Sequence, residues 1–154
     1  MIPCYPPNLK RKAKKINLSF SQNIAVEVNQ ENYDAIYNEL YDEFKKISLN
    51  VRETDNWLSA ESINASFGSI LRKDTSNVSV TKNRRQNGCV INCETVYKPS
   101  VAFGIFCVID FVLITTVIGF VLGFGATLGL YFYNKSLVEK AVKGALDNVK
   151  QNIG

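Results

Sequence analysis

A continuous apolar stretch, residues 101–133, limits the possible folds of this chain more than any other feature. It contains no Lys, Arg or Glu, and Asp110 is its only charged residue. A run of about 18 or more apolar residues is long enough to cross the roughly 30 Å hydrocarbon core of a bilayer. The stretch is longer than that, so it predicts a membrane-embedded protein.

Two arrangements fit the length of the stretch. In the first, a transmembrane segment over residues 100–137 folds as a hairpin of two short helices, 100–116 and 120–137, with its bend near Gly119. In the second, one helix spans about 112–133. Cytoplasmic flanks attract Lys and Arg, and two basic flanks favour the hairpin because it returns the chain to the same side. The basic flanking residues are Arg84, Arg85, Lys98, Lys135, Lys140 and Lys143.

Residues 22–99 have the pattern of a soluble α+β domain. Alternating apolar residues predict strands, and apolar residues spaced by three and four predict one helix. The expected order is β-α-β-β-β-β, one helix on a small, mostly antiparallel sheet. The predicted strands cover residues 23–29, 49–54, 57–67, 77–83 and 89–97, and the predicted helix covers residues 31–47.

Three local details follow from the residue types in this domain. Asn29 is expected to cap the helix, because an Asn side chain accepts hydrogen bonds from the first helical amides. The polar residues 72–76 are expected to form a connection rather than a strand. Trp57 is expected to share one face of its strand with Ile63, and the loop before Gly88 is expected to be a hairpin turn.

The two ends of the chain carry charge in different ways. Residues 138–154 predict an amphipathic C-terminal helix, which lies in a membrane interface, packs on the domain or pairs with a second copy. Residues 1–21 predict a flexible basic arm. Three interpretations stand for it: a solvated tail, a contact with anionic lipid head groups at about 1 kcal/mol per side chain, and, ranked last, contact with nucleic-acid phosphates. Its basic residues are Lys10, Arg11, Lys12, Lys14 and Lys15.

The four cysteines do not indicate a disulfide or a metal site. Cys89 and Cys93 fall in one predicted strand, about 13 Å apart on one face, which is too far for a disulfide. Cys4 and Cys107 lie elsewhere, and the chain has no His to complete a zinc site. We therefore expect buried thiols in a reducing compartment, and no metal and no cofactor.

Asp110 and the glycines are the candidate functional residues of the apolar stretch. An Asp at mid-membrane costs about 3 kcal/mol and is a functional candidate by default. The alternative is that Asp110 lies near the interface or bonds Thr115, Thr116 or Thr127. Two successive G-x-x-x-G spacings let helix backbones approach closely, within a hairpin or between copies. The glycines concerned are Gly119, Gly123, Gly125 and Gly129.

The chain lacks the motifs of common enzymes. It has no His, no G-x-G-x-x-G and no P-loop, so we expect a protein that is not an enzyme. The leading hypothesis is a membrane-anchored interaction, accessory or scaffold protein, bound to the lipid bilayer and to itself or another membrane protein. The first residues lack the apolar segment of a signal peptide. We therefore expect the domain to stay in the cytosol, at a bacterial cytoplasmic membrane, unless the apolar stretch itself directs export.

Two further hypotheses come from other functional classes. One is a small oligomeric transport or channel component that uses Asp110. The other is a lipid- or small-ligand-binding domain that uses the sheet face around Trp57. A pocket beside Trp57 lined by convergent polar groups would favour the latter.

Overall fold

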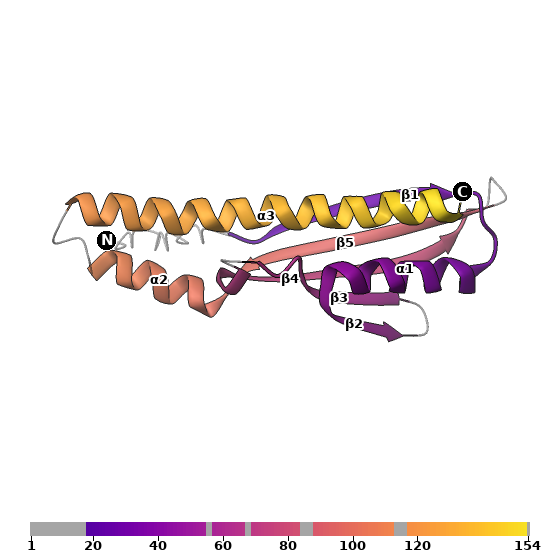
Figure 1. The fold of residues 1–154 in the computed structure, drawn as a ribbon, viewed down its shortest axis with the longest axis horizontal. Helices are drawn as coiled ribbons and strands as arrows, with labels where there is room; N and C mark the ends of the chain where they lie inside the picture. The colour runs from indigo at the N-terminus through magenta and orange to yellow at the C-terminus, as the bar shows by residue number, and fades with distance from the viewer. Residues whose placement is uncertain (1–17, 55–56, 67–68, 84–87, 113–116, 154) are drawn as a thin grey trace, which may run out of the picture.

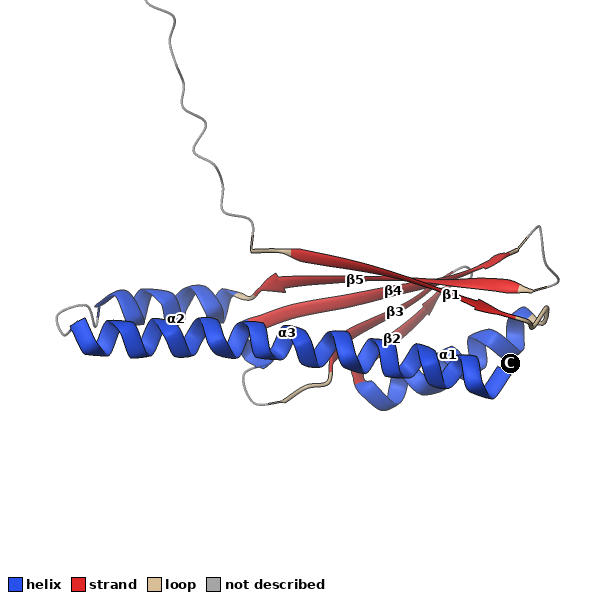
Figure 2. Cartoon of the chain, turned by 90° about the horizontal axis from the view of Figure 1, so that it is seen from above, coloured by secondary structure: helices blue, strands red, loops and turns tan. Residues whose placement is uncertain are grey.

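The chain folds into two layers, a five-stranded antiparallel sheet and a layer of helices on one of its faces (Figures 1 and 2). The computed structural model describes residues 18–54, 57–66, 69–83, 88–112 and 117–153. The elements are β1 (Phe20–Val28), α1 (Tyr33–Ile47), β2 (Ser48–Thr54), β3 (Trp57–Ile63), the 3-10 helix η1 (Ser69–Leu71), β4 (Arg72–Lys82), β5 (Cys89–Pro99), α2 (Val101–Val112) and α3 (Val117–Ile153).

The strand order in the sheet is β1-β5-β4-β3-β2. Strands β2 to β5 form a meander, and α1 carries the chain from the β1 edge of the sheet to the β2 edge (Figure 1). The register places Ile24 opposite Cys93, and Cys93 opposite Val78 on its other side. These apolar residues of three strands therefore form one row on the face that the helices cover.

The core lies between that face and the two helices α1 and α3. In α1, residues spaced by three and four point into it, so the predicted apolar face of this helix is confirmed. In α3, the buried residues of the second half recur at the same spacing. The fully buried side chains include Ile36, Leu40, Phe44, Leu58, Ile91, Val138, Val142, Leu146 and Val149.

The α+β class and the order of the elements in the domain are confirmed, with two local corrections. The N-cap of α1 is Asn32 rather than Asn29, and its side chain accepts hydrogen bonds from the amides of Asp34 and Ala35. Residues 72–76 belong to β4 rather than to a connection. In the sequence these residues resemble a loop because they are polar. Three of their side chains face the core, and each has a hydrogen-bond or ion-pair partner there.

Arg72 and Asp74 are the charged members of that polar group. The Arg72 side chain is 1% exposed and the Asp74 side chain 3%, and their Nη1 and Oδ1 atoms lie 3.3 Å apart. Arg72 Nη2 also donates to the carbonyl oxygens of Ile63 and Asn64. Asp74 Oδ2 accepts a bond from the Ile63 amide at 2.6 Å. The pair therefore closes the turn after β3, where Asn64 has a φ of 47°.

The predicted transmembrane hairpin is wrong. Among the described residues, no helix is both long enough and apolar enough to cross a membrane. At 1.5 Å per residue, α2 is about 18 Å long, which is short of the roughly 30 Å hydrocarbon core. α3 is long, but its apolar half continues without a break through Asn134 and Lys135 into a charged half. The same finding overturns the single span over about 112–133 and the description as an integral membrane protein.

The boundary expected between residues 137 and 138 lies inside one helix. α3 runs continuously from Val117 to Ile153, so the predicted amphipathic C-terminal helix is its second half. Of the three positions considered for that segment, it takes the one on the domain. Val142 is fully buried, and Asn148 Nδ2 donates a 3.0 Å bond to Glu43 on α1.

Candidate functional site

The candidate site is a pair of helices that projects beyond the sheet (Figures 1 and 2). This apolar helix pair consists of α2 and residues 117–133 of α3. It carries thirteen of the seventeen exposed large hydrophobic side chains in the described part of the chain. They are Val101, Ile105, Phe106, Val108, Ile109, Phe111, Val112, Ile118, Val121, Leu122, Phe124, Phe132 and Tyr133.

One face of α2 holds the two helices together. Phe103, Cys107 and Asp110 recur at spacings of four and three, so they lie on the same side of α2. The Phe103 ring lies 4.9 Å from the Tyr131 ring of α3. Burial, and less strongly the Asp110 charge, raise the pKa of the Cys107 thiol. The thiol therefore stays neutral inside the pair.

Asp110 is a bonding group between the helices. Its carboxylate is buried, with 6% of the residue exposed, and Oδ2 accepts a 2.8 Å hydrogen bond from the Thr127 hydroxyl. A Cβ added at Gly123 would lie 2.6 Å from Oδ1. Thr127 is one of the three threonines that the sequence offered as partners. These contacts point Asp110 into the helix pair and away from solvent.

Tyr131 ties the helix pair to the sheet. The Tyr97 hydroxyl on β5 donates a 2.7 Å bond to the Tyr131 carbonyl oxygen, and the two rings lie 5.0 Å apart. The Tyr131 hydroxyl in turn donates to the carbonyl oxygen of Leu18. Burial raises the pKa of Tyr131 to about 12, so the phenol stays neutral. The base of the pair is therefore fixed by uncharged hydrogen bonds.

The surface of α3 that faces away from this junction has a regular pattern. Its exposed positions recur at spacings of four and three, which is the repeat that lets one helix pack along another. We call this set the outer seam. It consists of Ile118, Leu122, Gly125, Gly129 and Phe132.

The glycines divide between the inner and outer sides of α3. On the inner side of α3, the Asp110 carboxylate occupies the space next to Gly123. On the outer side, a Cβ at Gly125 or Gly129 would meet no heavy atom within 4 Å. Gly119 lies in the first turn of the helix, at its partly exposed side. The two G-x-x-x-G spacings therefore do different things. One glycine makes the intramolecular contact, and Gly125 and Gly129 leave an open shelf on the surface.

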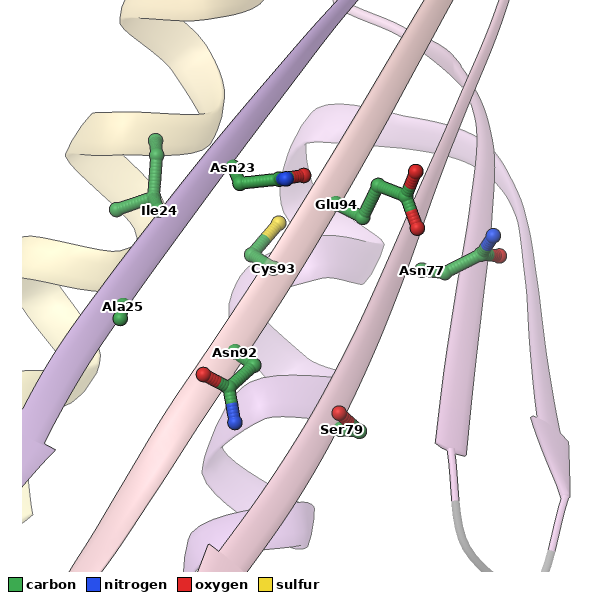
Figure 3. A pocket seen from close by; sticks show the side chains of 8 residues that line it. All are labelled: Asn23, Ile24, Ala25, Asn77, Ser79, Asn92, Cys93 and Glu94. Atoms are coloured by element: carbon green, nitrogen blue, oxygen red, sulfur yellow. The ribbon is translucent and has the colours of Figure 1, made fainter.

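A second candidate region lies on the face of the sheet that the helices leave uncovered. It is a shallow hollow of about 380 Å³ over β1, β5 and β4 (Figure 3). Its polar lining comes from Asn23, Asn77, Ser79, Asn92 and Glu94. No lining residue is a Lys or Arg.

Other predicted features add no further site. The basic residues Lys10, Arg11, Lys12, Lys14 and Lys15 lie outside the described residues. Cys89 and Cys93 are free and buried on β5, and burial raises the pKa of the Cys93 thiol to about 11. Within the described ranges, no group of three or more Cys, Asp or Glu side chains is placed to hold a metal ion.

Sequence reasoning missed both Tyr131 and the polar lining of the hollow. Tyr131 lies near the end of the apolar stretch, where a Tyr signals a hydroxyl that needs a partner when it is buried. Asn23, Asn77 and Asn92 are far apart in the sequence, and only the strand register brings them together. Their shared signal is an Asn at an outward position of three strands.

Comparisons with known proteins add no relative. No protein-family model, no curated protein and no solved structure matches this chain.

Proposed function

We propose that this chain is a non-enzymatic interaction protein that self-associates through its apolar helix pair. The observation that carries the proposal is the outer seam of α3, with its two open glycines. A second copy of the same seam is the proposed partner. Such an interface is isologous, since each copy presents the same surface to the other.

The area of exposed apolar surface is large enough for a second copy of the chain to bind. The thirteen side chains are between 37% and 83% exposed. Since large aromatic side chains bury about 150–250 Å² each, the pair presents on the order of 1,000 Å² of apolar surface. Soluble monomers rarely expose more than a few hundred Å² in one patch. A standard protein interface takes about 800 Å² from each partner.

The two open glycines indicate that the seam binds a helix rather than a lipid surface. Small residues at an interface gain contacts when a rigid partner backbone comes close to them. A lipid surface has no fixed backbone to place in that shelf, so it would gain nothing from Gly125 and Gly129 in particular. The four-three spacing of the seam likewise matches the side chains of a second helix.

Sedimentation velocity of the purified chain tests this proposal. We expect a species of at least twice the monomer mass. Leu122→Glu places a charge in the seam at a side chain that is 68% exposed, so it should yield monomers without loss of folding. Leu49→Glu is the matched control, because Leu49 is 70% exposed but lies on β2, away from the helix pair.

Two outcomes would overturn the proposal. One is a native chain that sediments as a monomer at every concentration at which it stays dissolved. The other is a monomer that binds phospholipid vesicles in a flotation experiment and loses that binding with Leu122→Glu. The second result would assign the seam to a lipid surface instead.

A further inference from the structure

The hollow on the open face of the sheet is lined mainly by polar side chains, whereas the helix pair exposes apolar ones. Asn23, Glu94 and Asn77 lie on the neighbouring strands β1, β5 and β4 and are direct neighbours in the register. Asn92 and Ser79 form the next pair along the same strands. Adjacent strands are about 4.8 Å apart, so polar groups recur across the hollow at that interval. Figure 3 shows them side by side on three strands.

Hydrogen bonds to neighbouring hydroxyl groups orient two of these amide side chains. Asn77 Oδ1 accepts a 3.1 Å bond from the Ser59 hydroxyl on β3. Asn92 Nδ2 donates a 3.1 Å bond to the Thr81 hydroxyl on β4. Within the described residues, the Asn77 NH₂ group and the Asn92 carbonyl oxygen have no hydrogen-bond partner of their own. The hollow therefore offers one fixed donor and one fixed acceptor.

The lining selects a type of ligand by its chemistry. Amides both donate and accept, and Glu94 only accepts when ionised. The lining has this one carboxylate and no cation, so an anionic ligand would be repelled and left unpaired. A sugar hydroxyl both donates and accepts, and it carries no charge. A ring with several hydroxyls matches amides that recur at about 5 Å.

Trp57 adds an apolar surface beside the hollow. It alternates with Ser59 along β3, so its indole lies on the same face as the Ser59 hydroxyl. It is one position beyond the pair of Leu58 with Val78, which places it beside Ser79. The indole is 42% exposed. A flat aromatic side chain of this kind packs against the C–H face of a sugar ring.

We infer that this hollow binds a neutral saccharide, held by Asn77, Asn92, Asn23 and Glu94 and stacked on Trp57. The site is independent of the self-association proposed above. Figure 2 shows that the helices cover one face of the sheet, and the polar side chains of the hollow alternate with the buried ones along β4 and β5, so they lie on the other face. The failure of this site would leave the outer seam untouched.

The single Trp of the chain supplies the readout. The purified chain is titrated with maltotriose, cellotriose, chitotriose and mannotriose, and with 3′-sialyllactose as the acidic comparison, while Trp fluorescence is recorded. We expect a saturable change with at least one neutral sugar and a weaker one with the acidic sugar. Asn77→Ala with Asn92→Ala should weaken binding at least about tenfold, because sugar hydroxyls are left unpaired.

Asn50→Ala is the matched control. Asn50 lies opposite Glu61 on the same open face, on the edge strand β2, outside the hollow. The affinity of Asn50→Ala should equal that of the native chain, and circular dichroism of each variant checks that it is folded. The inference is overturned if no neutral sugar gives a saturable change, if the double variant binds as tightly as the native chain, or if the acidic sugar binds best.

Discussion

Gly123 and Asp110 lie so close that a Cβ on the glycine would be 2.6 Å from Asp110 Oδ1. The other carboxylate oxygen accepts the hydrogen bond of Thr127 at 2.8 Å. The carboxylate is held between two positions that are four residues apart on α3. The charged residue of the apolar stretch therefore stabilises the packing of α2 on α3, and the glycine makes room for it.

Gly123→Ala is expected to destabilise the fold. The added methyl group displaces the Asp110 carboxylate from Thr127, and overpacking of this kind costs about 1–3 kcal/mol. Gly144→Ala is the control, since a Cβ there meets nothing within 4 Å and Ala is the better helix former by about 1 kcal/mol. Thermal unfolding followed by circular dichroism compares them. Equal midpoints for the two variants would show that the close contact is absent.

Arg72→Met is expected to be the most destabilising substitution in the sheet. It leaves Asp74 buried without its cation and frees the carbonyl oxygens of Ile63 and Asn64. Removing one member of a buried pair costs about 3–5 kcal/mol. Asp74→Asn should cost less than Arg72→Met, because Asn keeps an oxygen that accepts the Ile63 amide and leaves Arg72 its two carbonyl partners. Urea unfolding measures both, and the reverse order would contradict this role for Arg72.

The Cys93 thiol is expected to make the free energy of unfolding decrease as the pH rises in the alkaline range. Burial raises the pKa of its thiol from 9.0 to about 11. Above pH 9 the unfolded thiol ionises while the folded one stays protonated. The stability from this difference is fully present below pH 9 and decreases by about 1.4 kcal/mol per pH unit until about 11.

Urea unfolding between pH 9 and 10 checks this sign. The unfolding free energy of the native chain should fall across that interval. Cys93→Ser removes the titrating thiol and keeps a side chain of similar size, so its fall should be smaller. A native chain that becomes more stable over the same interval would contradict the burial of the neutral thiol.

The α+β domain of residues 22–99 could be predicted because its patterns are local. The period of α1 and the alternation of β5 are each visible within a dozen or so residues. The assignment of Trp57 to the face of Ile63 was wrong, because Ser62 has a φ of 56° and interrupts the alternation of β3. Leu58 and Ile63 are buried, whereas Trp57 is exposed. A left-handed residue changes which face the following side chains take.

The apolar stretch could not be interpreted from its length alone. A run of apolar residues predicts an apolar surface, but it does not show where the helices in the run begin and end. Here the run is divided between α2 and the first half of α3, and α3 continues onto the sheet. The hollow depended on the register between β1, β5 and β4, which pairs residues that are distant in the sequence. Neither relationship has a local signal.

The central claim is that the outer seam of α3 joins two copies of the chain at its glycines. The most direct measurement is the molar mass in solution, by light scattering, of the native chain, Gly129→Leu and Gly144→Leu. Both glycines have open space around a Cβ and lie on α3, but only Gly129 is in the seam. We predict that the native chain and Gly144→Leu are dimers or larger and that Gly129→Leu is a monomer. A native monomer, or equal masses for all three proteins, would contradict the claim.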